Sequence, residues 1–337
     1  MHAWLCDNPI GPDALRWTEL PTPEPKPHEV RVAIRAASLN FPDLLIVQNK
    51  YQMKPALPFV PGSEFSGVVE AVGTEVRHLV PGMAVASFGG LGGFATQVCV
   101  DAKLVMPLPD VGGKGFAFDD AAAFICTYAT THHALLDRAQ LQAGETVLVL
   151  GAAGGVGTAA IQIAKAAGAR VIAAASSEAK CELCKTLGAD ATIDYGGPGS
   201  VRERMDRLRQ DIKVATDGTG PDVVYDPVGA DFAEPVFRSI AWRGRYLVIG
   251  FAAGAIPSLP LNLALLKGAS IVGVFWGDFA RREPARNAKA LGELAGWYAA
   301  GKIKPVIDAR TPMRELPQAF ERMAGRGVRG KLVLHND

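Results

Sequence analysis

The chain has 337 residues, a formal net charge of +1 at pH 7, 49% hydrophobic residues and 20% charged residues. This length favours two domains, or one domain with a large insertion. The near-zero net charge argues against nucleic-acid or anionic-membrane partners. The N-terminus shows no secretory signal, no apolar run is long enough to span a membrane, and the five cysteines are scattered. We therefore expect a cytoplasmic protein.

The first part of the chain is expected to be rich in β-structure. Short apolar runs alternate with turn signals such as Pro81-Gly82. The expected strands cover residues 30–37, 67–72, 83–87 and 96–100.

Strand and helix signals alternate in the second part of the chain. An Ala-rich helical stretch covers 121–136, and further helices are expected at 155–167 and 178–187. Short apolar strands are expected at 146–150, 170–175, 192–194, 223–225, 246–249 and 271–275. This alternation is typical of a parallel sheet with helices on both faces. The tail adds a helix at 285–300 and a strand at 331–334.

A glycine-rich loop joins the first of these strands to its helix. Residues 147–157 follow the order strand, tight turn and helix, with Ala152 where the usual motif has its first glycine. The helix N-terminus is suited to a pyrophosphate, because its backbone N–H groups are free. The expected contacts are Ala153, Gly154, Gly155, Val156 and Gly157. The alternative is a plain glycine-rich strand–helix turn.

The second strand indicates which dinucleotide binds. An NAD site normally carries Asp or Glu at the end of this strand. Here the strand 170–175 ends at Ser176 without an acid, and Lys180 follows four residues later. A 2′-phosphate is attracted by such a pair and repelled by a carboxylate, so NADPH is favoured over NADH. The alternative is that Lys180 is a solvated helix lysine.

Six motifs together resemble the medium-chain dehydrogenase/reductase superfamily, in its zinc-free quinone oxidoreductase branch. They lie at 37–43, 61–67, 152–157, 194–195, 224–229 and 330–334. The resemblance implies an α/β protein with a GroES-like catalytic domain and an inserted Rossmann domain. We expect the catalytic domain to begin with 1–122 and the Rossmann NADPH-binding domain to cover 123–265. Residues 266–337 are expected to carry a dimerisation strand and to return to the catalytic domain.

The resemblance also implies site residues. Asn40, Asp43 and Tyr51 match positions on the acceptor side, although Tyr51 is equally consistent with a loop aromatic that covers a domain edge. The implied cofactor contacts are Thr130 near the nicotinamide, Tyr195 near the adenosine phosphate, Phe251 and Lys331, with Arg326 or Arg329 as alternatives to Lys331.

No metal is expected. Zinc-dependent relatives carry a Cys where Ser38 stands and a His where Ser63 stands, and zinc needs about three such ligands. Cys181 and Cys184 form a CxxC pair inside an expected helix, without a second pair.

The resulting hypothesis is an NADPH:quinone oxidoreductase without zinc, with Asn40 and Tyr51 donating hydrogen bonds to the acceptor. One alternative is reduction of the C=C bond of an enal, enone or enoyl thioester, and a second is a non-catalytic NADPH-binding protein. The resemblance implies that the apolar segment 270–276 pairs with its equivalent in a second subunit. An exposed apolar edge strand otherwise favours aggregation, so we expect a homodimer.

Overall fold

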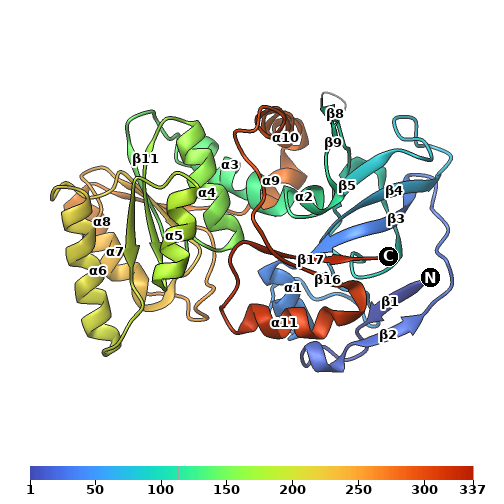
Figure 1. The fold of residues 1–337 in the computed structure, drawn as a ribbon, viewed down its shortest axis with the longest axis horizontal. Helices are drawn as coiled ribbons and strands as arrows, with labels where there is room; N and C mark the ends of the chain where they lie inside the picture. The colour runs from blue at the N-terminus through green and yellow to red at the C-terminus, as the bar shows by residue number, and fades with distance from the viewer. Residues whose placement is uncertain (112–113, 337) are drawn as a thin grey trace. The chain divides into compact units, whose positions relative to one another are not determined.

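The computed structural model describes residues 1–111 and 114–336. It divides into two compact units, and many of their elements are labelled in Figure 1. Unit 1 combines Met1–Cys126 with the C-terminal segment from Pro305, and unit 2 comprises Thr127–Lys304. Within the described residues, no helix combines the length and apolar character needed to cross a bilayer.

Unit 2 contains a six-stranded parallel sheet in the order β12-β11-β10-β13-β14-β15. Strand β10 pairs with β11 on one side and β13 on the other, so the strand order reverses there. This is the doubly wound topology, in which ligands bind outside the carboxyl ends of the strands at the reversal point. The strands are β10 (Thr146–Val149), β11 (Arg170–Ala175), β12 (Ala191–Asp194), β13 (Val223–Asp226), β14 (Arg245–Val248) and β15 (Ser270–Gly273).

Both faces of this sheet are buried. Leu148 of β10 belongs to one apolar cluster with Leu208 of α6 and Phe237 of α7. Val147 and Val149 are fully buried as well, and they point to the opposite face because side chains alternate along a strand. Helix α4 contacts β10 and β11, and α5 contacts β11 and β12. The helices are α4 (Gly155–Ala166), α5 (Glu178–Thr186), α6 (Val201–Ala215), α7 (Ala233–Arg238) and α8 (Asn262–Lys267).

The helix expected at 121–136 is interrupted. The structure has α2 (Phe118–Ala122) and α3 (Thr130–His132), with π-helical turns at Ile125–Ala129 and His133–Arg138. The backbone N–H of Cys126 donates to the Glu64 carboxylate at 2.8 Å. This N–H group therefore does not donate to a backbone carbonyl of an α-helix, which accounts for the first interruption.

Unit 2 extends further than the Rossmann domain expected at 123–265. Strand β15 is part of the same sheet, because Ile271 pairs with Tyr246 of β14. Helices α9 (Trp276–Arg282) and α10 (Pro284–Ala299) also belong to unit 2. The return to unit 1 therefore occurs at Pro305.

Unit 1 is built around a sheet that both ends of the chain form together. Its order is β16-β17-β3-β4-β5-β7, and β6 also pairs with β3. Ala37 of β3 lies opposite Leu334 of β17, so the last strand of the chain is antiparallel to an early one. The strands are β3 (Glu29–Ser38), β4 (Glu64–Val72), β5 (Ala84–Phe88), β6 (Gln97–Asp101), β7 (Val105–Pro107), β16 (Ile307–Pro312) and β17 (Lys331–His335).

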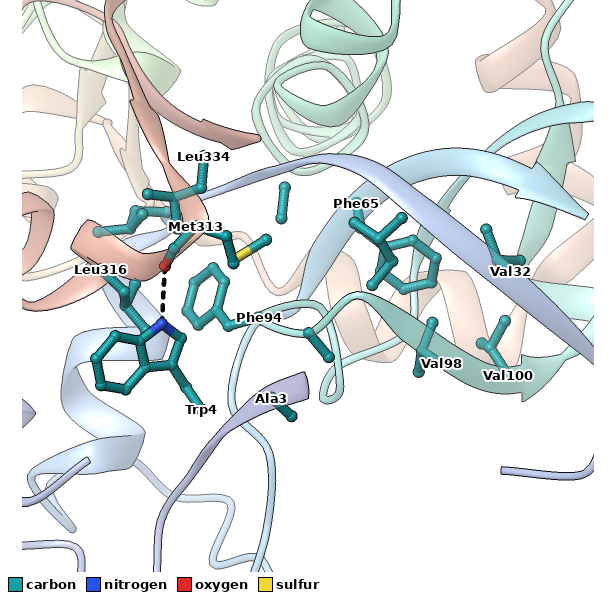
Figure 2. Close-up of a cluster of buried hydrophobic side chains, with 14 of the residues drawn as sticks. Ala3, Trp4, Val32, Phe65, Phe94, Val98, Val100, Met313, Leu316 and Leu334 are labelled. Carbon is teal, nitrogen blue, oxygen red and sulfur yellow. Dashed lines mark hydrogen bonds between the residues drawn. The ribbon is translucent and has the colours of Figure 1, made fainter. Parts of the chain in front are cut away.

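Smaller elements complete unit 1. They are β1 (His2–Leu5), β2 (Arg16–Glu19), β8 (Asp110–Val111), β9 (Lys114–Gly115), α1 (Phe41–Val47) and α11 (Leu316–Ala324). The hydrophobic core joins residues from both segments, including Phe65 and Phe94 from the first and Leu334 from the second (Figure 2). The Trp4 indole N–H donates to the Met313 carbonyl at 2.8 Å, which fixes the N-terminal strand to the C-terminal segment.

Candidate functional site

The glycine loop lies at the carboxyl end of β10 and leads into α4. Gly154 is the N-cap of α4, and Gly151 adopts a φ of 56°. A Cβ on Gly157 would lie 2.4 Å from the Gly151 carbonyl oxygen, so only glycine permits this approach of helix and turn. The first N–H groups of α4 have no partner within the helix. The loop therefore has the shape and the donors that a pyrophosphate needs.

Ser176 and Lys180 come together at the end of β11. The Lys180 ammonium lies 3.2 Å from the Ser176 hydroxyl oxygen. The following turn also packs here, because the Tyr195 N–H donates to Ala175 and a Cβ on Gly196 would meet the Ser176 carbonyl at 2.3 Å. Burial raises the pKa of Tyr195 to about 12, so its hydroxyl remains a donor. These groups place the Lys180 ammonium and several hydrogen-bond donors beside the glycine loop.

Thr130 and Phe251 lie in unit 2 at the start of α3 and after β14, respectively. Next to Thr130, the Thr131 and Tyr225 hydroxyl oxygens are 2.9 Å apart and buried. Phe251 lies against the turn that follows β13, because a Cβ on Gly229 would be 2.8 Å from its ring. Both Thr130 and Phe251 are partly exposed.

A buried cluster of polar side chains is centred on Glu64 in unit 1. One carboxylate oxygen, Oε2, accepts from the Ser38 hydroxyl and the Asn40 amide, each at 3.0 Å, and from Lys331 Nζ at 3.3 Å. The other oxygen, Oε1, accepts the Cys126 N–H. Glu64 is completely buried, so these donors replace the water that its charge would otherwise require.

Asp43 is a second buried carboxylate, and it joins two segments of the chain by hydrogen bonds. Its carboxylate accepts the backbone N–H of Asn40 at 2.8 Å and that of Ser63 at 3.0 Å. Burial raises the pKa of Asp43 to about 6, although these hydrogen bonds and the Lys331 charge oppose the rise. Asp43 thus holds the chain at the start of α1 against the segment before β4.

The side-chain amide of Asn40 also forms its hydrogen bonds within unit 1. Its amide oxygen accepts from Lys331 at 2.6 Å, and its amide nitrogen donates to Glu64 and, at 3.4 Å, to the Ser63 hydroxyl. Both amide hydrogens therefore have acceptors within unit 1. The expected hydrogen bond from Asn40 to an acceptor molecule does not fit this geometry, and a positioning role fits better.

Tyr51 differs from its buried neighbours. It is partly exposed and packs against the edge of the unit 1 core. Its hydroxyl makes no hydrogen bond within the described residues. Burial raises the pKa of Tyr51, and the nearby Cys126 and Asp43 raise it further, so the hydroxyl remains protonated at neutral pH. Tyr51 thus offers an uncommitted O–H donor.

The structure does not support the expected contact between Lys331 and the cofactor. Its side chain is only 5% exposed, and its ammonium is directed at Asn40 and Glu64. Arg326 and Arg329 are more accessible, and the Arg329 guanidinium lies 3.6 Å from Asp308. Of the three basic residues considered from the sequence, the two arginines are the ones accessible to a ligand.

The comparisons with known proteins cover nearly the whole chain. Residues 26–110 match the alcohol dehydrogenase GroES-like domain, and residues 155–293 match the zinc-binding dehydrogenase family. A quinone oxidoreductase-like protein 2 from Bos taurus is 38% identical over 93% of this chain and 87% of its own length. A quinone oxidoreductase from Pseudomonas aeruginosa is 37% identical over 96% of both chains. The chain belongs to the medium-chain dehydrogenase/reductase superfamily, in its quinone oxidoreductase branch.

A solved structure supports the same assignment. The quinone oxidoreductase of Thermus thermophilus, described also in complex with NADPH, is 33% identical, and the two structures align with a TM-score of 0.84 over 100% of both chains. Unit 1 is thus the GroES-like part of a medium-chain dehydrogenase/reductase, and unit 2 is its Rossmann part.

The zinc-binding name of the matched family raises the question of a metal. Ser38 and Ser63 carry hydroxyls that are bonded within the Glu64 cluster. Among residues 1–111 and 114–336, no group of three or more His, Cys, Asp or Glu side chains is arranged to hold a metal ion. The cation beside Glu64 is instead the Lys331 ammonium.

A surface groove of about 760 Å³ lies elsewhere in unit 2, between α6 and α7. None of the predicted cofactor residues lines it. Its arginines and its acids are equal in number: Arg202, Arg209 and Arg238 against Asp206, Asp231 and Glu234. This balance gives no net attraction for a phosphate, so we do not place the cofactor in this groove.

Sequence reasoning did not single out two buried carboxylates, Glu64 and Asp226. Glu64 stands inside a motif used for the family resemblance, and a charged residue is rarely fully buried unless it has a partner. Asp226 follows Val223, Val224 and Tyr225. Lys331 and Cys126 lie far from Glu64 in the chain, and Tyr246 lies 20 positions from Asp226, so the pattern alone did not identify these partners.

Proposed function

We propose that this protein is an NADPH-dependent oxidoreductase that reduces a quinone without a metal. The observation that carries the cofactor proposal is the Ser176–Lys180 pair, 3.2 Å apart at the end of an acid-free second strand. The Thermus thermophilus relative that is described in complex with NADPH supports it. The quinone acceptor is supported by the curated relatives in this branch.

The residues present fit the cofactor. Gly154 and Gly157 leave room for a pyrophosphate at the N-terminus of α4, and the helix dipole favours its charge. Ser176 and Lys180 would hold the 2′-phosphate, and Tyr195 would lie beside the adenosine. Bound NADPH would supply the hydride. Thr130 and Phe251 are proposed to orient its nicotinamide half.

Tyr51 is the proposed donor to the acceptor. Hydride addition to a quinone or a conjugated carbonyl creates negative charge on oxygen, which a fixed O–H donor stabilises. The hydroxyl of Tyr51 is uncommitted within the described residues, whereas the Asn40 amide is not. Asn40 and Asp43 are proposed to hold the loop around the start of α1 in place.

We propose that the reaction requires no zinc. Lys331 places its ammonium 3.3 Å from Glu64 and 2.6 Å from Asn40. A divalent cation at the same carboxylate would be repelled by this charge. Ser38 and Ser63, which stand where zinc-dependent relatives carry ligands, are already hydrogen-bonded in the cluster.

The proposed partner is a second copy of the chain. Strand β15 is the last strand of its sheet, and Ile271 is 41% and Phe275 56% exposed. Pairing of β15 with its equivalent would cover this apolar edge. Light scattering should show a dimer, and Ile271→Lys should shift it towards monomer. Val214→Lys, at an exposed apolar residue on α6, should leave the dimer intact.

The test of the activity is NADPH oxidation in the presence of benzoquinone, naphthoquinone, a 2-alkenal and crotonyl-CoA. The proposal expects turnover with a quinone and retention of that activity after dialysis against a chelator. Activity confined to the alkenal or the thioester would replace the quinone by a C=C bond as the reduced group. NADPH binding without any turnover would identify a non-catalytic protein.

A further inference from the structure

A buried hydrogen bond joins Asp226, at the carboxyl edge of the unit 2 sheet, to Tyr246 in the neighbouring strand. Asp226 is the last residue of β13, Tyr246 is the second residue of β14, and each residue is 2% exposed. The Tyr246 hydroxyl donates to Asp226 Oδ2. Burial raises the pKa of Asp226, and the hydrogen bonds it accepts oppose this rise. The buried carboxylate is therefore held by defined donors.

The other oxygen of Asp226 shapes the turn that follows β13. Its Oδ1 accepts the backbone N–H of Val228 at 2.7 Å and that of Gly229 at 2.9 Å. Gly229 has a φ of 68° and a ψ of −143°, a conformation that other residues rarely adopt. The carboxylate thus stabilises a turn that has little intrinsic preference for this shape.

The turn 227–229 lies between two proposed cofactor elements. On one side, a Cβ on Gly151 of the glycine loop would be 3.0 Å from Val228. On the other side, Ala252 and Ala253 donate backbone hydrogen bonds to the carbonyls of Pro227 and Val228, each at 3.0 Å. These bonds attach the loop that carries Phe251. A movement of the turn would therefore be transmitted to Phe251.

The position in the sheet indicates which half of the cofactor is affected. The strand order reverses at β10, with β11 and β12 on one side and β13 and β14 on the other. Ser176 and Tyr195, which are assigned to the adenosine half, follow β11 and β12. A dinucleotide crosses such a reversal point, so its second half lies over β13 and β14.

We infer that Asp226, held by Tyr246, is a positioning residue for the nicotinamide half of the dinucleotide. It acts through the turn 227–229 and the loop that carries Phe251. The inference rests on the cofactor part of the proposed function and is independent of the acceptor.

The test compares NADPH with adenosine 2′,5′-bisphosphate, which lacks the nicotinamide half. Asp226→Ala should raise the Kd for NADPH about tenfold, because it removes three hydrogen bonds. The Kd for the fragment should not change. Asp226→Asn retains an amide oxygen for the turn and should restore most of the affinity. Tyr246→Phe, a milder change, should give a smaller loss in the same direction.

Thr216→Val is the matched control. Thr216 is buried at the C-cap of α6 and bonds to Ile212 and Gly220 through its hydroxyl. This variant should lose stability while both ligands bind normally. Hydrogen exchange of the amides of Val228, Gly229, Ala252 and Ala253 should be faster in Asp226→Ala and unchanged in the control.

Equal weakening of NADPH and the fragment in Asp226→Ala would overturn the inference, because the pair would then support the unit as a whole. Unchanged NADPH affinity in both Asp226→Ala and Tyr246→Phe would overturn it as well. Failure of the proposed reaction has a different signature: the wild-type protein would bind NADPH and show no turnover with quinones.

Discussion

The Lys331 ammonium lies 2.6 Å from the Asn40 amide oxygen, although 291 positions separate the two residues in the chain. The contact exists because β17 is antiparallel to β3 in the unit 1 sheet. It gives Lys331 a structural role in neutralising the buried Glu64, and it directs the Asn40 amide hydrogens to Glu64 and Ser63. The catalytic proposal therefore rests on Tyr51.

Removal of the Lys331 charge should strongly destabilise the protein. Lys331→Met leaves the fully buried Glu64 without its cation, and loss of one partner of a buried pair costs about 3–5 kcal/mol. Urea denaturation measures the change. Lys165→Met is the control, because the Lys165–Asp190 pair is exposed and worth less than about 1 kcal/mol. Similar losses in the two variants would contradict the role of Lys331.

Asp43 should make the folding stability depend on pH. Its pKa is about 6 in the folded protein against an ordinary value of 3.8, so the folded state binds more protons between these values. The stability contribution of Asp43 is fully present below pH 3.8 and is lost as the pH rises through 6, by about 2–3 kcal/mol in all.

Asp43→Asn provides the comparison for this prediction. The free energy of unfolding of the wild type minus that of Asp43→Asn should fall between about pH 4 and pH 7 and then level off. Denaturation curves at several pH values measure this difference. A constant difference across the range would show that Asp43 titrates as an ordinary carboxyl.

Tyr51→Phe should lower catalysis while the fold is retained. Phenylalanine keeps the packing against the edge of the core and removes only the hydroxyl, so we expect kcat to fall about tenfold. The Kd for NADPH and the melting temperature should stay near those of the wild type. Tyr298→Phe on α10 is the matched control. Full activity in Tyr51→Phe would exclude its hydroxyl as the donor.

Lys180→Ala should change the cofactor preference. The ammonium beside Ser176 is proposed to bind the 2′-phosphate, and charge-assisted hydrogen bonds are worth about 1.5–3 kcal/mol. The Kd for NADPH should therefore rise roughly 10- to 100-fold, with little change for NADH. Lys185→Ala, on the same helix and paired with Glu182, should alter neither affinity. Equal losses for both cofactors would remove Lys180 from the phosphate site.

Gly157→Ala should abolish NADPH binding. The added Cβ would lie 2.4 Å from the Gly151 carbonyl and 2.7 Å from Ala152 backbone atoms, so the glycine loop would have to move. Isothermal titration calorimetry measures the loss. Gly296→Ala on α10 is the control, because its Cβ meets no atom within 4 Å among the described residues. This control should be neutral or stabilise by up to about 1 kcal/mol.

Local signals in the sequence were sufficient for much of unit 2. The strand expected at 170–175 coincides with β11, and the helix expected at 155–167 matches α4 within one residue. The glycine loop was identified for the same reason, because strand, turn and helix follow one another directly. In unit 1, by contrast, β16 and α11 were not anticipated. For β16 the reason is that the strand is mostly half-buried and alternates weakly.

The sequence by itself determined the two-domain α/β class, the glycine loop and the absence of an acid after the second strand, because each is encoded by residues close in the chain. Only the tertiary structure decided that Lys331 meets Asn40 and Glu64, and that Tyr246 donates to Asp226. Such pairs depend on strand order and register, which join residues that no local pattern relates. Buried charges need partners, and the fold alone determines which partners are within reach.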